Sequence, residues 1–598
     1  MSKPPTGIQD MVHSLESGRI QLVLRVILVS IGILTATAAY LFLEARNFSN
    51  PEAMELAQVG RNLAEGRGYT TRMIRPMSLQ LMRERMKERE LPPTQLLLKP
   101  HPDLQNPPLY PVMLAGLFKA LPADWVSGLP ADSNRMRPKG ELAITVFNLF
   151  WFAVGTFLLF RLGRRLFDVW VGGMAAAVYA GTEMMWRFSS NGLPTPFLVV
   201  LVILLAEMLT RLDDTGAELA PGVVPAFWKP ACLAAGVGVI LGIGFLTRYS
   251  FAWLVIPAVI WMLVTHVRRW SAVTICILTL VVFAGPWMAR NYHLSGRFLG
   301  TASSALTSGT VTLPGAEQER LLNPPKANPD LKELRVKFAV NGSEMLRESM
   351  PKLGGNWLSF FFFAGLLLPF RRAPVRRLRW FTVGALGLMF VVEALGRTHL
   401  SMRVPEINGE NQLALLTPLV FLFGAGLFFS LIESTELGHP LFQKLLAGGA
   451  WILFSLPFLS SLLPPRTYPM VEPLYRPDIV QGITSYIQPD EMIMSDIPWA
   501  VAWYGNRDCM WLPMMVKDPG GEDFFAVNDF ERRVSALYIS PLTSEAPLRQ
   551  VAEGSEVWAL FYFDALMRRN LPTGFPLLHA YEGSARSGHF FLADRRRW

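Results

Sequence analysis

Long apolar segments recur along this chain of 598 residues and are separated by polar stretches. The hydrocarbon core of a bilayer is roughly 30 Å thick and takes about 20 apolar residues per helix, so the pattern predicts about eleven transmembrane helices. We expect them near residues 21–43, 141–160, 169–187, 193–210, 230–247, 250–265, 271–288, 355–370, 379–396, 411–432 and 445–463. An odd number of spans places the two ends of the chain on opposite sides of the membrane.

The apolar run at 109–121 is shorter, and we interpret it as a juxtamembrane or re-entrant helix. Counting it as a span would invert the topology of everything that follows. Without it, the arginines of 161–165, 268–269 and 371–379 lie in cytoplasmic loops, as the positive-inside rule requires. The N-terminus is then cytoplasmic, segment 21–43 is a retained span and not a cleaved signal peptide, and the C-terminal tail is extracytoplasmic.

The predicted fold is an α-helical multi-span membrane protein with a small C-terminal α/β domain. Residues 1–43 form the cytoplasmic N-terminus and first span, and 44–140 the first outer loop. Residues 141–463 form the bundle, interrupted by a second outer loop at about 289–354, and 464–598 form the extracytoplasmic domain. Within that domain we predict strands at 492–495, 510–512, 536–539 and 557–562 and a helix at 477–487.

The composition supports a membrane protein, because 51% of residues are hydrophobic and only 17% are charged, with a mean hydropathy of +0.29. The net charge of +9 follows from the loop arginines. No basic face with interleaved aromatic residues is visible, so nucleic acid is excluded as a partner. Three cysteines give no disulfide framework.

The first outer loop carries the most informative acids. Asn50 and Pro51 predict a helix start, and Glu52 and Glu55, three residues apart, share a face of that helix. Transfer of a group to a hydroxyl needs a carboxylate that takes the proton, and either glutamate could supply it. The alternative is that these acids only complement the helix dipole. A second helix at 79–90 is densely charged and resembles a solvated or headgroup-facing helix.

The positive-inside rule disfavours basic residues at the outer ends of spans, so their presence there indicates a function. Arg248, Arg290 and Arg403 converge on the leaflet that holds the acids, where guanidinium groups could bind a phosphate. Snorkelling towards lipid headgroups is the alternative for any one of them. Neighbouring candidates for substrate binding are Tyr249, Asn291, Tyr292, His101, Asp103, Asn106 and Tyr110. For His101 and Asp103 a structural role is the more common explanation.

No glycine-rich phosphate loop, metal-ligand spacing or nucleophile elbow occurs in the sequence. We therefore expect no required cofactor and no metal ligands, although a divalent metal remains compatible with the chain.

Five motifs, in order along the chain, resemble the GT-C class of membrane glycosyltransferases, in the branch of protein O-mannosyltransferases and aminoarabinose transferases. They are Arg-Asn-Leu-Ala-Glu-Gly-Arg-Gly-Tyr (61–69), Asn-Pro-Pro-Leu-Tyr-Pro (106–111), Arg-Leu-Gly-Arg-Arg-Leu-Phe (161–167), Leu-Thr-Arg-Tyr (246–249) and Gly-Pro-Trp-Met-Ala-Arg-Asn-Tyr (285–292). The resemblance covers roughly residues 20–425.

The resemblance implies an outer-leaflet active site, a polyprenyl-phosphate-linked sugar donor and a glycan, lipid or protein acceptor at a bacterial-type inner membrane. The family's catalytic acid, usually an aspartate, falls on Glu52 by its spacing from Arg61, and an alternative alignment places it on Glu55. A transporter or flippase of lipid-linked material is the competing function, but it predicts polar sites near the midplane, often in paired repeats, and no repeat is visible.

Overall fold

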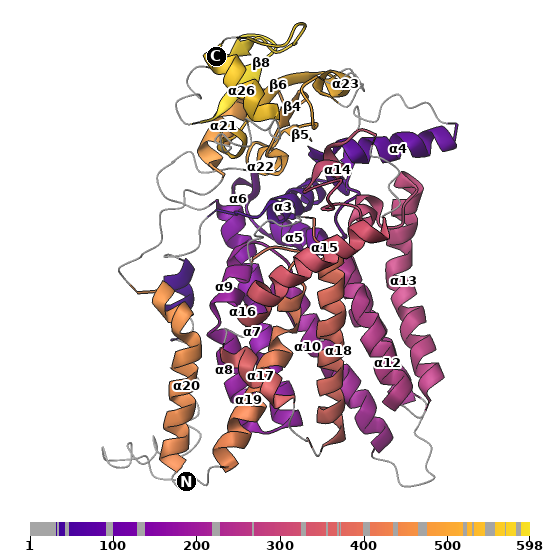
Figure 1. The fold of residues 1–598 in the computed structure, drawn as a ribbon, viewed down its shortest axis with the longest axis vertical. Helices are drawn as coiled ribbons and strands as arrows, with labels where there is room; N and C mark the ends of the chain where they lie inside the picture. Colours follow the sequence, from indigo (N-terminus) through magenta and orange to yellow (C-terminus); the bar gives the residue numbers. More distant parts are fainter. Residues whose placement is uncertain are drawn as a thin grey trace, which may run out of the picture.

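The structure is a computed structural model. It describes residues 32, 35–41, 47–90, 100–127, 138–217, 228–265, 268–323, 330–353, 357–366, 370, 372–398, 407–434, 440–463, 475–517, 523–528, 532–544, 557–568, 570–581 and 588–598. Long helices form a bundle, and a sheet lies at one end of it (Figure 1). Several shorter helices, among them α3 (Pro51–Ala64), α4 (Pro76–Glu88), α5 (Leu109–Ala120) and α15 (Leu331–Glu344), lie between the two.

Seven of the described helices are long and apolar enough to cross a membrane, so the chain is a multi-pass membrane protein. These seven spans are Lys139–Leu166, Thr195–Thr215, Trp228–Thr247, Arg269–Ser295, Ala373–Gly396, Leu413–Ser434 and Leu441–Ser461. They belong to the helices α7 (Lys139–Leu166), α10 (Thr195–Ala217), α11 (Trp228–Thr247), α13 (Arg269–Ser295), α18 (Ala373–Gly396), α19 (Thr417–Ser434) and α20 (Pro440–Ser461).

Three further expected spans coincide with shorter apolar helices. These are α8 (Val169–Ala180) followed by α9 (Glu183–Ser190), η1 (Tyr249–Leu254) continued by α12 (Val255–Thr265), and α17 (Trp357–Gly365). Most of the first expected span, 21–43, lies outside the described residues. The total of eleven therefore stays a prediction. The run at 109–121 forms the 12-residue helix α5, which is too short to cross a bilayer and packs on α3.

The sheet at the end of the bundle has the strand order β2-β5-β4-β6-β8-β7. Its strands are β2 (Met73–Ile74), β4 (Met492–Ser495), β5 (Asp508–Trp511), β6 (Val534–Ile539), β7 (His579–Ala580) and β8 (Phe590–Ala593). The first four named are parallel, and β8 is antiparallel to both β6 and β7. The helices of this region are α21 (Pro477–Ser485), α22 (Pro498–Tyr504), α23 (Phe524–Asn528), α24 (Pro541–Ser544) and α26 (Val557–Met567).

The predicted α/β character of this region is confirmed, with one error. The apolar run at 557–562, expected as a strand, is the first half of the helix α26. The run continues through Phe563, Ala565 and Leu566, and such length favours a helix over a strand. The predicted helix at 477–487 and the strand at 492–495 are found as α21 and β4.

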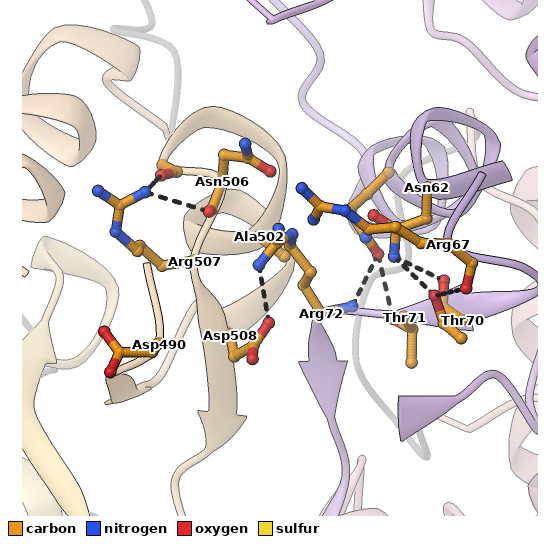
Figure 2. Close-up of polar contacts among 12 residues, drawn as sticks. Asn62, Arg67, Thr70, Thr71, Arg72, Asp490, Ala502, Asn506, Arg507 and Asp508 are labelled. Atoms are coloured by element: carbon orange, nitrogen blue, oxygen red, sulfur yellow. Dashed lines mark hydrogen bonds and ion pairs between the residues drawn. The ribbon is translucent and has the colours of Figure 1, made fainter. Parts of the chain in front are cut away.

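The segment expected as the first outer loop is built into this sheet, because β2 pairs in parallel with β5 and so places the two segments side by side. Figure 2 shows the junction, where Arg72 donates from Nη1 to Asp508 Oδ1 at 2.9 Å. On the loop side, Asn62 Nδ2 donates to the carbonyl oxygen of Thr70 at 2.9 Å and ties α3 to β1 (Thr70–Thr71). Strand β1 pairs with β3 (His101–Pro102), so two parts of the loop about 30 residues apart are held together.

The remaining short elements are α6 (Ala123–Ser127), η2 (Gly300–Ser304), α14 (Glu317–Arg320), η3 (Met345–Ser349) and α16 (Met350–Lys352), which lie in the two segments expected as outer loops, and η4 (Leu413–Leu416), which begins the span Leu413–Ser434.

Candidate active site

The helix α3 presents the two candidate acids. Asn50 caps it as expected, with Oδ1 accepting the backbone N–H of Glu52 at 2.9 Å and of Ala53 at 3.4 Å. Pro51 occupies the first helical turn, where its missing N–H costs nothing. The cap therefore fixes the first turn of α3 and the backbone of Glu52 with it.

Glu52 faces the bundle and pairs with Arg248, whose Nη2 lies 2.5 Å from Oε1. Arg248 stands between α11 and η1, in a hairpin too short to carry it away from the membrane surface. The side chain of Glu52 nevertheless keeps 35% of its surface exposed, whereas Arg248 keeps 10%. The surrounding protein atoms raise the pKa of Glu52, and Arg248 opposes that rise only in part. Glu52 is thus a partly exposed acid with an increased affinity for a proton.

Glu55 has a different environment. Both of its oxygens are held by Arg75, with Nη1 at 2.6 Å and Nη2 at 2.8 Å, and Asn106 donates to Oε1 at 3.0 Å. Only 5% of the side chain is exposed. Arg75 also pairs with Glu319 at 2.5 Å, which links the first outer loop to α14. A bidentate buried pair of this kind suits a structural role for Glu55.

Asp103 and Asn106 organise the turn that follows β3. Asp103 Oδ1 accepts the backbone N–H groups of Gln105 at 2.7 Å and Asn106 at 3.0 Å, and its Oδ2 accepts from Asn106 Nδ2 at 2.9 Å. Burial raises the pKa of Asp103, and the nearby charge of Glu55 adds to that rise. Asp103 and Asn106 therefore connect the Glu55 pair to the backbone of the loop.

His101 is buried beneath the start of α4, with 4% of its surface exposed. Ser78 Oγ lies 2.8 Å from His101 Nε2 and donates its own hydrogen to the carbonyl oxygen of Arg75, so Nε2 is the protonated nitrogen of the ring. Among the described residues Nδ1 has no hydrogen-bond partner. Burial and the charge of Arg75 lower the pKa of His101 to about 4. His101 is hence a neutral, packed side chain.

Arg290 lies in the last turns of α13 and is held by neutral groups. Its Nη1 donates to the carbonyl oxygen of Asp103 at 2.7 Å and to Asn291 Oδ1 at 2.9 Å. The guanidinium also stacks over the rings of Trp287 and Tyr69, at 4.5 Å and 5.2 Å from their centroids. The hydrogen bonds of Arg290 to described residues go to neutral oxygens, the carbonyls of Asp103 and Tyr69 and the Asn291 amide, so its charge can pair with an anion.

The phenol of Tyr249 joins this group, because it accepts from Trp287 Nε1 at 2.8 Å and from Asn291 Nδ2 at 3.2 Å. Arg248 and Tyr249 are adjacent in sequence, so this phenol links the Arg248 hairpin to the helix that carries Arg290. The structure thus connects the two arginines through a short chain of polar contacts.

The remaining candidates are dispersed. Tyr110 is fully buried, and its single O–H lies within hydrogen-bond distance of two acceptors, Asn148 Oδ1 at 3.1 Å and the carbonyl oxygen of Gly192 at 3.0 Å. Tyr292 is 41% exposed and stacks on Phe298, whereas its neighbour Asn291 is fully buried. Arg403 lies outside the described residues.

Sequence reasoning missed the segment around Gly409. A Cβ at Gly409 would lie 1.5 Å from Glu52 Oε2 and 2.7 Å from Arg248 Nη2, so this backbone lies directly against the ion pair. The segment is anchored by Glu393, whose Oε2 accepts the backbone N–H of Gln412 at 2.9 Å. Two features of the sequence mark this segment and its anchor: Gly409 itself, and Glu393, an acid near the end of an apolar segment where burial of its charge costs free energy. Neither feature indicates contact with α3.

Metal binding has no obvious site in the described part of the chain, where no three His, Cys, Asp or Glu side chains are grouped as an ion would need.

Comparison with known proteins gives a family match over part of the chain and a fold. Residues 133–288 match the family described as dolichyl-phosphate-mannose-protein mannosyltransferase. This segment includes Arg248 but neither Glu52 nor Arg290. A search of curated protein sequences found no match.

Among solved structures, the chain is similar to ArnT from Cupriavidus metallidurans bound to undecaprenyl phosphate, with a TM-score of 0.51 and 12% identity over 95% of this chain and 98% of that one. The apo form of that protein gives 0.49 at 11% identity, over 97% and 99% of the two chains. The oligosaccharyltransferase AglB from Archaeoglobus fulgidus, in complex with an inhibitory peptide and a dolichol-phosphate, gives 0.46 at 10%, over 84% and 70%. The chain thus has the ArnT fold, and the resemblance to GT-C membrane glycosyltransferases seen in its motifs is confirmed.

Proposed function

We propose that this protein is a membrane glycosyltransferase that moves a sugar from a polyprenyl-phosphate-linked donor to an acceptor on the extracytoplasmic face. The observation that carries the proposal is the partly exposed Glu52 side chain in contact with Arg248, in a protein with the ArnT fold. Glu55, the other candidate acid, is occupied by Arg75 and Asn106. This contrast favours Glu52 over Glu55 as the catalytic base.

In the proposed reaction the acceptor hydroxyl attacks the anomeric carbon of the donor sugar. The bond between that carbon and the phosphate oxygen breaks, and the lipid phosphate leaves with both electrons of the bond. The hydroxyl proton passes to Glu52, whose raised pKa makes it a better proton acceptor than an ordinary glutamate. An acceptor that is itself a phosphate would need no base, and Glu52 would then orient it.

Arg248 has two roles in this proposal. Without donor it neutralises Glu52 at 2.5 Å. A donor phosphate would compete for the same guanidinium, and the phosphate gains negative charge as the sugar departs, which strengthens its contact with Arg248 in the transition state. Weakening of the Arg248–Glu52 contact at that moment increases the basicity of Glu52.

Arg290 would supply the second positive charge for the phosphate. Its guanidinium is oriented by the carbonyl of Asp103 and by two aromatic rings, so it needs little reorganisation to meet an anion. Tyr249 and Asn291 would fix the distance between this group and Arg248.

The proposed topology places the N-terminus in the cytoplasm and the sheet region outside. The positions of arginines support this topology. Arg269 begins α13, whereas Arg290 lies near the opposite end of the same helix. Arg164 and Arg165 likewise lie in the last turn of α7, whose first turn contacts α6 of the outer loop. In a bacterial-type cell the site would face the envelope.

The proposal is tested with detergent-purified protein and a panel of undecaprenyl-phosphate-linked sugars, by following release of undecaprenyl phosphate in the presence of envelope lipids, glycans and proteins as acceptors. Acceptor-dependent release supports the proposal. Translocation of the intact donor across proteoliposomes, with no cleavage of the glycosidic bond, would instead support the flippase alternative and contradict it.

A further inference from the structure

The helix α22 of the C-terminal region lies directly on α3, the helix that carries Glu52. The first contact is near the end of α3, where Arg61 donates from Nη1 to the carbonyl oxygen of Trp503 at 2.9 Å and from Nη2 to that of Ala502 at 2.7 Å. The guanidinium also lies 4.8 Å from the centroid of the Trp503 ring. Two hydrogen bonds and a stacked ring fix this end of α3 to α22.

The second contact reaches the start of α3 through Glu141, at the beginning of α7. Trp503 Nε1 donates to Glu141 Oε1 at 2.9 Å, and Glu141 Oε2 accepts the backbone N–H of Phe48 at 3.0 Å. Phe48 immediately precedes the residues that lead into the Asn50 cap. Glu141 and Phe48 are both fully buried. One indole thus connects to both ends of the helix that presents Glu52.

The surroundings leave little room for these side chains to shift. Phe48 packs on Gly192, where an added Cβ would lie 2.5 Å from the Phe48 ring. Beside Glu141, a Cβ at Gly140 would lie 3.0 Å from the carbonyl oxygen of Trp125 and 3.8 Å from the Trp503 ring. Close packing of this kind transmits displacements because few voids are available to absorb them.

We propose that Trp503 and Glu141 are positioning residues that set the location of the Glu52 carboxylate relative to Arg248. This inference rests on the proposed function, and it gives the C-terminal region a role in the reaction of the membrane site. If the start of α3 moved, Glu52 would shift relative to the Arg248 guanidinium, which a different part of the chain holds in place. Proton transfer is sensitive to such shifts, because displacement by about 1 Å can cost roughly a hundredfold in rate.

The test uses two conservative variants of the full-length protein. Trp503→Phe keeps an aromatic ring over Arg61 but removes the N–H that reaches Glu141. Glu141→Gln keeps one acceptor oxygen but replaces the other with an amide N–H₂, which cannot accept a hydrogen bond. Either the bond from Trp503 or the bond from Phe48 is therefore lost. Trp499→Phe is the matched control, because Trp499 lies on the same helix but packs against Tyr475 and Trp511 within the C-terminal region.

For each variant, kcat and the KM for the donor are measured with the undecaprenyl-phosphate-linked sugar that supports turnover, together with the melting temperature. We expect kcat to fall about tenfold or more in Trp503→Phe and in Glu141→Gln, because a displaced base slows proton transfer. The donor KM should not rise, since a displaced Glu52 competes less well with the donor phosphate for Arg248. Trp499→Phe should retain kcat even if its melting temperature falls.

The inference is overturned if kcat in both variants stays within about twofold of the parent. It is also overturned if kcat falls only in proportion to the folded fraction, as it would for a purely structural contact. Loss of transfer in Glu52→Gln with full kcat in both Trp503→Phe and Glu141→Gln would reject this inference alone. Retained transfer in Glu52→Gln would reject the role of Glu52 as the base, on which this inference rests, and absence of donor cleavage by the parent protein would reject the proposed function.

Discussion

Replacing Gly409 by alanine tests the geometry around Glu52. The added Cβ would lie 1.5 Å from Glu52 Oε2 and 2.5 Å from its Cδ. Carbon and oxygen atoms in ordinary contact are roughly 3.5 Å apart, so the carboxylate would have to retreat by about 2 Å. Glu52 is a flexible, partly exposed side chain, and it can move away without unpacking the core.

The expected result is therefore a large effect on rate and a small effect on stability. A displacement of about 1 Å can cost roughly a hundredfold, so kcat in Gly409→Ala should fall at least that far. The free energy of unfolding should change by less than about 1 kcal/mol, since no apolar core is opened or overpacked. The assay is donor turnover at saturating lipid, with the melting temperature measured on the same preparation.

Gly396→Ala is the matched control, because an added Cβ there meets nothing within 4 Å. A double-mutant cycle with Glu52→Asp sharpens the test, since the shorter acid relieves part of the clash and the two losses should not add. Unchanged kcat in Gly409→Ala would refute the placement of this backbone against Glu52.

Three further predictions concern pH and charge. Because Glu52 must be deprotonated to act and its pKa is raised by burial, kcat should rise with pH along a limb whose midpoint lies above 4.5, and a kcat that is flat down to pH 4.5 would contradict this role. The pKa of His101 falls from 6.5 to about 4 on folding, so between these pH values the unfolded chain binds a proton that the folded chain does not. The free energy of unfolding should therefore be highest above pH 6.5 and fall by about 3 kcal/mol as pH approaches 4. Melting curves of His101→Gln should lack this pH dependence. Arg290→Ala should lower kcat/KM for the lipid donor by roughly ten- to a hundredfold through the loss of charge-assisted hydrogen bonds, with partial recovery in Arg290→Lys, and an unchanged affinity for undecaprenyl phosphate would exclude Arg290 from the phosphate site.

Local patterns in the sequence predicted the local structure well. The Asn50-Pro51 start of α3 appears with its expected cap, and the short apolar run at 109–121 forms α5. The error at 557–562 arose because a short apolar run fits a strand and a helix equally well until its length is considered.

The contacts that distinguish the two acids were beyond sequence reasoning, because they join residues far apart in the chain. Glu52 meets Arg248 across 196 positions, and Arg61 meets Trp503 across 442. Glu52 and Glu55 have similar surroundings in sequence, and only the fold brings Arg75 and Asn106 to Glu55 while leaving Glu52 accessible.

The central claim is that Glu52, and not Glu55, takes the acceptor proton. Its most direct test compares transfer by Glu52→Gln and Glu55→Gln, expressed per folded molecule. We predict that kcat falls by roughly a hundred- to ten-thousandfold in Glu52→Gln, the usual contribution of a general base. In Glu55→Gln we predict a lower folded yield, because Arg75 loses one of its two carboxylate partners, with transfer largely kept. Wild-type kcat in Glu52→Gln, or its selective loss in folded Glu55→Gln, would contradict the account.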